Sequence, residues 1–182
     1  MPLSIFPKPY ADFVARLRVP SGFVLVAAFA WFAHPSARSL AFGVALSAAG
    51  LALRAWAAGH LAKNQELTTG GPYAYVRNPL YLGTLVVAAG LAIACRSLGL
   101  AILFALVFLF IYLPVIMLEE QHLSELFPEF ERYAATVPSL LPYRRPRSSN
   151  GRFFWALYRK NQEYQALLGF LAGLAWLIWR CR

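Results

Sequence analysis

Apolar residues along the chain gather into five long runs, which are separated by short polar or charged segments. A helix needs about 20 residues to cross a hydrocarbon layer of about 30 Å, and apolar runs of this kind are typical of transmembrane helices. They do not show the two-residue alternation of a membrane β-barrel. The pattern predicts an all-α fold, a polytopic integral-membrane helical bundle with about five spans: Val19–Ala33, Ser39–Ala58, Pro79–Ala94, Leu98–Tyr112 extending to Leu118, and Tyr164–Trp179.

The first, third and fifth runs are short for a full crossing. Short spans recruit flanking residues, thin the bilayer or begin below its surface. In the second run, Gly43, Gly50 and Gly59 favour close approach to another helix. That helix could belong to the same chain or to a second copy, so the oligomeric state stays open. No internal repeat is present, and we expect one domain over residues 1–182.

Two amphipathic segments precede the first and the last of these runs. Tyr10, Phe13, Val14 and Leu17 recur at helical spacing among charged residues, which is typical of an interfacial helix or of a solvated lead-in to the first span. Residues 152–164, RFFWALYRKNQEY, mix aromatic and basic side chains before the last run. We therefore expect interfacial helices on the cytoplasmic side.

The third and fourth runs are joined only by Cys95, Arg96 and Ser97. So short a connection predicts an antiparallel hairpin whose two cytoplasmic ends lie together. Pro114 lacks a backbone donor and should bend the fourth helix near its cytoplasmic end. Beyond it, Leu123, Leu126, Phe127 and Phe130 keep helical spacing, which predicts an amphipathic continuation outside the bilayer. Residues 138–151 are rich in Pro, Arg and Ser and are expected to form a loop.

Composition agrees with a membrane protein, because 59% of the 182 residues are hydrophobic, 14% are charged and the mean hydropathy is +0.53. The net charge is +9 and unevenly distributed: twelve of the 17 Lys and Arg residues fall on the side of the N-terminus, four on the other side, and Arg54 inside the second run. The positive-inside rule then predicts a cytoplasmic N-terminus and a C-terminus on the opposite side, in what we expect to be a bacterial inner membrane.

Composition also narrows the function classes. The basic residues alternate with membrane-entry points, which argues against a nucleic-acid partner. The N-terminal residues, with Pro2, Pro7 and Pro9, do not match a cleaved signal peptide. The scattered cysteines and histidines lack the spacing of zinc ligands, so we predict no metal site: Cys95, Cys181, His34, His60 and His122.

Polar residues concentrate at the cytoplasmic ends of the predicted hairpin. The segment GGPYAYVRNPLYLG, residues 70–83, precedes and enters the third run. Each of its residues has a purely structural explanation: Asn78 as a helix cap before Pro79, Arg77 as an interfacial anchor, and the tyrosines as an aromatic belt.

The paired carboxylates Glu119 and Glu120 are harder to explain structurally. Adjacent negative charges at a helix end repel each other and require a cation, which Arg77 would supply across the hairpin. Glu119 and His122 are three residues apart and share a helix face. A cluster of Arg, Asn, Tyr, Glu and His beside apolar helices suits a ligand with a zwitterionic and an aromatic end.

These two segments resemble the isoprenylcysteine carboxyl methyltransferase and phospholipid methyltransferase family. Residues 70–83 are similar to that family's signature, and Glu119–Glu120 followed by LFPEFERYAATVPSLLP, residues 126–142, are similar to its continuation. The resemblance covers residues 67–142. Asn78 stands where the prenylcysteine enzymes usually carry histidine, and Thr136 where eukaryotic members carry arginine.

The resemblance implies a membrane methyltransferase that uses S-adenosylmethionine on the cytoplasmic side and acts on a lipophilic substrate, an isoprenylcysteine-like carboxylate or a lipid head group, entering from the bilayer and its lipids. It implies a cofactor pocket lined by Tyr73, Arg77, Asn78, Tyr81, Glu119, Glu120 and His122. On physical grounds we expect Arg77 to bind the cofactor carboxylate and Glu120 its ammonium group, with Asn78 or His122 at the ribose or adenine. The tyrosines would form walls that favour a sulfonium.

No residue need become covalently modified, and the catalytic residues stay unassigned. A carboxylate or thiolate substrate can attack directly, whereas an ammonium group needs a proton acceptor, for which Glu66 and Tyr133 are candidates. Two other functions remain open. One is an NADPH-dependent membrane reductase of the sterol reductase type, and the other is a non-enzymatic membrane adaptor subunit.

Overall fold

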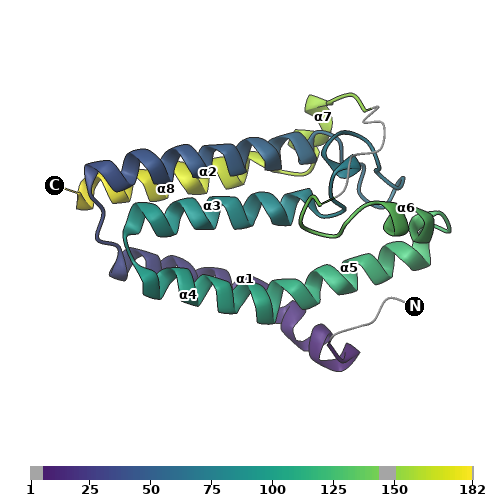
Figure 1. Ribbon diagram of the computed structural model, residues 1–182, viewed down its shortest axis with the longest axis horizontal. Coiled ribbons are helices and arrows are strands. Elements are labelled where there is room, and N and C mark those ends of the chain that lie inside the picture. Colours follow the sequence, from purple (N-terminus) through teal and green to yellow (C-terminus); the bar gives the residue numbers. More distant parts are fainter. Residues whose placement is uncertain (1–5, 144–150, 182) are drawn as a thin grey trace.

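The computed structural model describes residues 6–143 and 151–181 of the chain. Its long helices lie side by side along one axis, while α6, α7 and the longer loops gather at one end (Figure 1). The chain's described part begins near that end and finishes at the other. The elements are α1 (Lys8–Phe32), α2 (Ala37–Ala58), the 3₁₀ helix η1 (Gly71–Ala74), α3 (Pro79–Cys95), α4 (Leu98–Val107), the π-helix η2 (Phe108–Tyr112), α5 (Leu113–Leu126), α6 (Phe130–Thr136), α7 (Trp155–Lys160) and α8 (Tyr164–Arg180).

The predicted all-α membrane fold is confirmed. Three helical stretches of the described chain are long and apolar enough to cross a membrane: Lys8–Phe32, Ala37–Ala58 and the continuous run Leu98–Leu126. Helix α3 is apolar but has 17 residues, and α8 also has 17. These two helices occupy the predicted third and fifth runs almost residue for residue, and their crossing of the membrane stays a prediction.

Helix α1 differs from the sequence expectation. The predicted interfacial segment and the first span form one continuous helix that contains Pro20. Pro20 removes one backbone hydrogen bond, but the helix continues on both sides of it. The amphipathic segment therefore extends the first span at its N-terminal end and is not a separate element.

A π-helical segment, η2, ends two residues before Pro114 in the fourth run, where the sequence predicts a bend. Pro114 has no N–H to offer the carbonyl of Phe110, four residues earlier. The Tyr10 hydroxyl of α1 donates to that carbonyl over 2.8 Å. The proline thus creates an acceptor that fastens α1 to the middle of the fourth run.

The predicted continuation beyond the bilayer is shorter than expected, because α5 ends at Leu126. Pro128 follows closely and disfavours helical backbone at Phe127. Leu123, Phe127 and Phe130 still pack together, in a cluster with Tyr133 and Val137. The predicted loop 138–151 lies partly outside the described residues, and α7 covers less of the segment 152–164 than expected.

Helices α2 and α3 are held at close distance by facing glycines. A Cβ on Gly90 would lie 2.5 Å from the Gly43 carbonyl oxygen, and one on Gly50 would lie 2.7 Å from that of Gly83. Ser47 of α2 also donates to the Val87 carbonyl of α3 over 3.1 Å. Gly43 and Gly50 of the second run therefore pack within the chain against α3, whereas Gly59 lies against Phe153.

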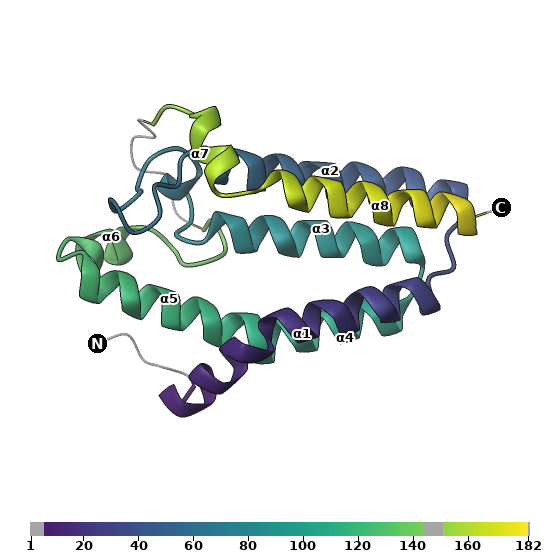
Figure 2. The same cartoon turned by 180° about the vertical axis from the view of Figure 1, so that it is seen from behind.

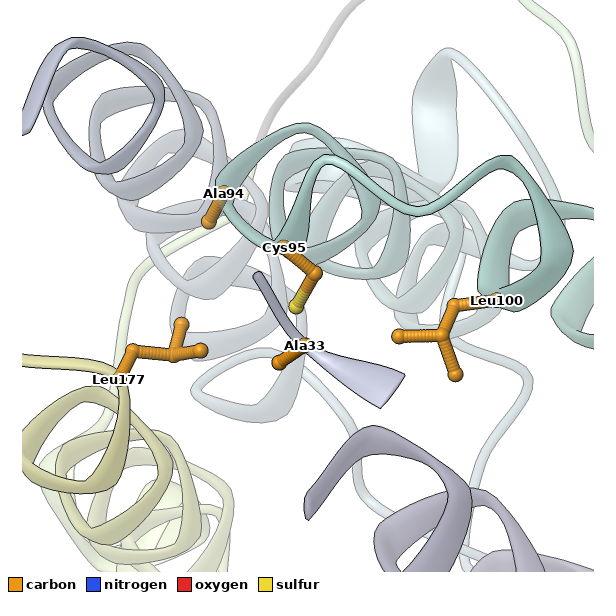
Figure 3. Close-up of a cluster of buried hydrophobic side chains, with 5 residues drawn as sticks. All are labelled: Ala33, Ala94, Cys95, Leu100 and Leu177. Carbon is orange, nitrogen blue, oxygen red and sulfur yellow. The ribbon is translucent and has the colours of Figure 1, made fainter. Parts of the chain in front are cut away.

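The end remote from α6 is closed by small and branched side chains. Ala33, Ala94, Cys95, Leu100 and Leu177 converge there from different elements (Figure 3). The turn between α3 and α4 is tight, with Arg96 in the left-handed region at φ 54°. This confirms the predicted hairpin. Arg180 of α8 donates to carbonyls at the end of α1, including that of Ala33 over 2.9 Å.

Candidate functional site

The polar segment before α3 is fixed against the segment after α6 by backbone pairing. Arg77 N–H donates to the Pro138 carbonyl over 2.9 Å and Asn78 N–H to the Ser139 carbonyl over 3.0 Å. Upstream, Gly71 has φ +57°, and a Cβ there would lie 2.5 Å from the His60 ring. Glycine is required both by the backbone conformation and by the lack of space. Two segments about 60 residues apart in sequence thus become one framework.

Glu120 is the centre of the polar network that this framework carries. Its Oε1 accepts from Arg77 Nε over 3.0 Å and its Oε2 from Arg77 Nη2 over 2.7 Å. Oε1 also accepts from Asn78 over 2.6 Å and from the Ser139 hydroxyl over 2.7 Å. The two charged side chains are only 14% and 17% exposed. A bidentate pair of this kind is strong and directional because both N–H groups meet the same carboxylate.

Arg77 has little hydrogen-bonding capacity left. Its Nη1 donates to the carbonyls of Ala134 and Val137 over 3.0 and 2.6 Å, in addition to the two bonds to Glu120. Four of the five N–H groups of the guanidinium are engaged. Arg77 and Glu120 thus direct their charges at each other, which makes them a joint between α3, α5 and α6.

The capping role considered for Asn78 is wrong. Asn78 occupies the position before α3, but its side chain makes no capping hydrogen bond. Instead the amide nitrogen donates to Glu120 and to Ser139. The side-chain NH₂ group of Asn78 is directed at a charged acceptor, the Glu120 carboxylate, and in this orientation the side-chain oxygen makes no bond to the N–H groups of α3.

Glu119 points to a different cation. Its carboxylate accepts from the Tyr81 hydroxyl over 2.9 Å and from Arg18 of α1 over 3.3 Å. The Arg18 guanidinium also lies over the Tyr81 ring, 5.6 Å from its centre. Arg18 and Glu119 are 46% and 45% exposed, so their ion pair is screened and weak. The Glu119 carboxylate and the Tyr81 ring thus form a place for a positive charge, and the Arg18 guanidinium that occupies it is weakly bound.

A polar pocket of about 550 Å³ brings these groups together. Its lining includes all seven residues expected from the sequence: Tyr73, Arg77, Asn78, Tyr81, Glu119, Glu120 and His122. His122 is exposed at the rim, one helical turn from Glu119. Thr136 is exposed on α6, where its hydroxyl donates to the Tyr133 carbonyl over 3.0 Å. It does not line this pocket.

Tyr133, one candidate proton acceptor, is a hydrogen-bond donor in the structure. Its hydroxyl donates to the Tyr73 carbonyl over 2.7 Å. Burial raises the pKa of Tyr133, and the opposing effect of Arg77 does not cancel this. Burial likewise raises the pKa of Tyr73. Both phenols are therefore neutral at physiological pH, and Tyr133 holds η1 in place. Glu66 is exposed and lines the polar pocket.

An ion pair that the sequence did not predict includes Arg54, which lines this pocket. Arg54 of α2 donates from Nε and Nη2 to Glu163, over 2.6 and 3.0 Å. Its Nη1 donates to the Thr84 hydroxyl and, over 3.3 Å, to the Leu80 carbonyl. An arginine within an apolar run was a visible signal for a site residue. Glu163 precedes α8 without any such signal.

Among the described residues, no three His, Cys, Asp or Glu side chains are grouped as metal ligands.

Curated proteins similar to this chain come from bacteria and a yeast. The cobalt-zinc-cadmium resistance protein CzcN of Cupriavidus metallidurans is 38% identical over 102 residues, which is 55% of this chain and 46% of that protein. The nickel-cobalt-cadmium resistance protein NccN of Alcaligenes xylosoxydans xylosoxydans is 34% identical over 140 residues, 75% of this chain and 59% of that protein. The protein-S-isoprenylcysteine O-methyltransferase of Schizosaccharomyces pombe is 29% identical over 141 residues, 74% of this chain and 59% of that protein.

The chain thus spans about half to three fifths of the length of these relatives. No solved structure matches it significantly. The family model for phospholipid methyltransferases matches residues 22–129, which is more than half of the chain and contains both halves of the polar network around Arg77 and Glu120. The chain therefore belongs to the phospholipid methyltransferase family of membrane proteins.

Proposed function

We propose that this membrane methyltransferase uses S-adenosylmethionine and acts on a lipophilic substrate that enters from the bilayer. The observation that carries the proposal is the polar pocket, where the signature segment before α3 and the paired glutamates of α5 share one cavity. Family membership supplies the reaction class, and the pocket supplies a site with suitable chemistry at the end of apolar helices.

The residues of the polar pocket suit the methyl donor. Its volume of about 550 Å³ lies within the range of small-molecule sites. Arg18 shows that a cation is accommodated between the Glu119 carboxylate and the Tyr81 ring. S-adenosylmethionine supplies a methyl group on a cationic sulfur, together with an ammonium group. Since Glu120 is already paired with Arg77, we assign Glu119 rather than Glu120 to the ammonium group, and the Tyr81 ring to the sulfonium.

Arg77, Asn78 and Glu120 are positioning residues in this proposal. Their network fixes the relation between the Tyr81 end of α3 and the Glu119 turn of α5. Methyl transfer from sulfur to a nucleophile breaks one C–S bond and forms one bond to the methyl carbon, and the positive charge on sulfur is lost. Such a displacement depends mainly on alignment and exclusion of water. Rigid positioning is therefore the contribution that the network is suited to make.

An anionic nucleophile fits the pocket best. It needs no proton acceptor, and Tyr133 is excluded from that role by its raised pKa and its bond to Tyr73. An ammonium substrate would leave the acceptor role to Glu66, which lines the polar pocket. We further propose that the pocket and the start of α1 face the cytoplasm of a bacterial inner membrane, with the end of α8 on the opposite side.

Binding of the methyl donor is the direct test. Calorimetry of the purified protein in detergent should show saturable, one-site binding of S-adenosylmethionine and of its demethylated product. An absence of saturable binding would remove the proposal. Saturable NADPH binding in its place would indicate a reductase, and a stable protein partner without binding of either cofactor would indicate an adaptor.

Arg18→Gln is expected to tighten binding of the methyl donor by about 2- to 5-fold, because the Arg18 side chain competes with the donor's positive charge for Glu119. The exposed pair of Arg18 with Glu119 contributes little energy, so the gain is small. Calorimetry at low salt measures the change. Arg16→Gln, an exposed arginine on the same helix, is the matched control and should leave the affinity unchanged. A large loss of affinity in Arg18→Gln would mean that Arg18 binds the donor's carboxylate.

A further inference from the structure

A second, apolar cavity of about 810 Å³ lies between α1 and α8, over α3. Figure 2 shows α1 and α8 in front of the other helices, on either side of α3. The walls of the apolar cavity include Phe29 of α1 and Phe170 and Trp176 of α8. The cavity reaches Cys95 and Leu100, which belong to the buried cluster that closes the remote end (Figure 3).

The apolar cavity meets the polar pocket at one place. Arg54 and Thr84 line both cavities. Along α3, the apolar cavity extends from Thr84 to Cys95, which corresponds to roughly 16 Å at 1.5 Å per residue. A molecule with an extended apolar tail could therefore lie along α3 with its polar end at Arg54 and the pocket of Glu119 and Tyr81 beyond it.

Arg54 is an unusual residue for this position. It lies one helical turn before the end of α2, within an apolar helix that is long enough to span a membrane. It is 22% exposed, and its partner Glu163 is 8% exposed. Buried ion pairs are poor stabilisers, since desolvation offsets their attraction and apolar residues of similar size hold helices at least as well. Ionisable residues at membrane depth most often have a role in ligand binding or transport.

The arrangement of hydrogen bonds divides Arg54 into two edges. Nη1 is held by α3 through Thr84 and Leu80. The edge formed by Nε and Nη2 meets the Glu163 carboxylate in a bidentate pair. This edge presents two parallel N–H groups to a planar anion. An anion can take that place only by exchanging with Glu163, which therefore acts as an internal competitor.

We propose that Arg54 determines substrate specificity by binding an anionic lipid head group in exchange for Glu163, while the lipid's apolar tail occupies the cavity between α1 and α8. This inference rests on the proposed function, since it names the substrate class of the same site. A neutral or cationic head group gains nothing from the exchange and leaves the Arg54–Glu163 pair intact. The occupant is a lipid with a tail in the cavity, because the polar end of that cavity leads to the proposed methyl donor site.

Brominated fatty acid supplies a probe that is independent of methyl transfer. Trp176 lines the cavity, and bromine atoms quench nearby tryptophan fluorescence. Dibromostearic acid, ionised at alkaline pH, and its methyl ester have the same tail and differ only in head-group charge. In lipid nanodiscs without a methyl donor, the acid should quench saturably at lower concentration than the ester. Trp176→Phe should remove that saturable component and thus serves as the control for position.

Two variants change the head-group site in opposite directions. Glu163→Gln removes the internal competitor and is expected to bind the acid several-fold more tightly, with the ester unchanged. Arg54→Gln should weaken binding of the acid by about 10-fold or more, in line with the loss of a charge-assisted bidentate contact, and again leave the ester unchanged. Arg54→Lys keeps the charge without the bidentate edge and should fall between the wild type and Arg54→Gln.

The double variant Arg54→Gln and Glu163→Gln guards against misfolding, because it leaves no buried charge unpaired. It should fold and bind acid and ester equally. The proposal is overturned if the double variant still prefers the acid, or if all variants change the two affinities in parallel, as a purely structural tether predicts. Calorimetry with S-adenosylmethionine on the same proteins separates the two proposals, since donor binding can persist when lipid selectivity is absent.

Discussion

Glu120→Gln is expected to abolish methyl transfer and to lower the free energy of unfolding by roughly 3 kcal/mol, the lower end of the cost of leaving one partner of a buried ion pair without its counterion. The neutral amide cannot accept from all four donors that now meet the carboxylate: Arg77 Nε, Arg77 Nη2, the Asn78 amide and the Ser139 hydroxyl. The loss should separate the segment before α3 from α5, so affinity for the methyl donor should fall as well. Thermal unfolding in detergent measures the loss of stability, and calorimetry with S-adenosylmethionine measures the loss of affinity.

Glu125→Gln is the matched control for this prediction. It makes the same chemical change on the same helix, at an exposed residue whose side chain accepts only a long bond of 3.5 Å from Gln121. Its unfolding temperature and donor affinity should equal those of the wild type. Equal behaviour of Glu120→Gln and Glu125→Gln would contradict the positioning role of the network and return Arg77 to the interpretation as an interfacial anchor.

Gly90→Leu is expected to destabilise the protein by about 3 kcal/mol or more, at the upper end of the cost of overpacking a core. Even the first added carbon would lie 2.3 Å from the Ser47 hydroxyl and 2.5 Å from the Gly43 carbonyl oxygen. The serine can rotate away, but the backbone oxygen cannot move without a shift of α2. Because α3 carries Tyr81 and α2 carries Arg54, the shift should also weaken binding of S-adenosylmethionine at Tyr81 and of an anionic lipid at Arg54.

Gly169→Ala on α8 controls for the change of a helical glycine as such. Nothing lies within 4 Å of the Cβ that it adds, so the melting temperature should stay the same or rise slightly. Gly90→Ala should fall between Gly90→Leu and the wild type. A wild-type melting temperature for Gly90→Leu would mean that α2 and α3 separate at little cost, against the packing described here.

The sequence predicted which polar residues gather in one place better than it predicted which of them pair with each other. All seven expected residues line one pocket, because the tight turn at Cys95–Ser97 fixes which helix ends meet. The roles within the pocket were harder to predict. Opposite charges from α3 and α5 satisfy each other when they come within reach, and so Arg77 pairs with Glu120 while Glu119 meets Arg18 from α1. No spacing rule connects Arg18 or Glu163 with residues about a hundred positions away.

By itself, the sequence determined the helical membrane class, the approximate first and last residues of α2, α3 and α8, and the two polar segments of the site. These features follow from hydropathy, prolines and short turns, which act over a few neighbouring residues. Only the tertiary structure decided which arginine each glutamate meets, why the Asn78 side chain does not cap its helix, and that Arg54 lines both a polar and an apolar cavity. These properties depend on distances between helices that are remote in sequence. They are set by glycine contacts between α2 and α3 and by the ion pairs at the ends of the helices, which appear only when all elements are packed together.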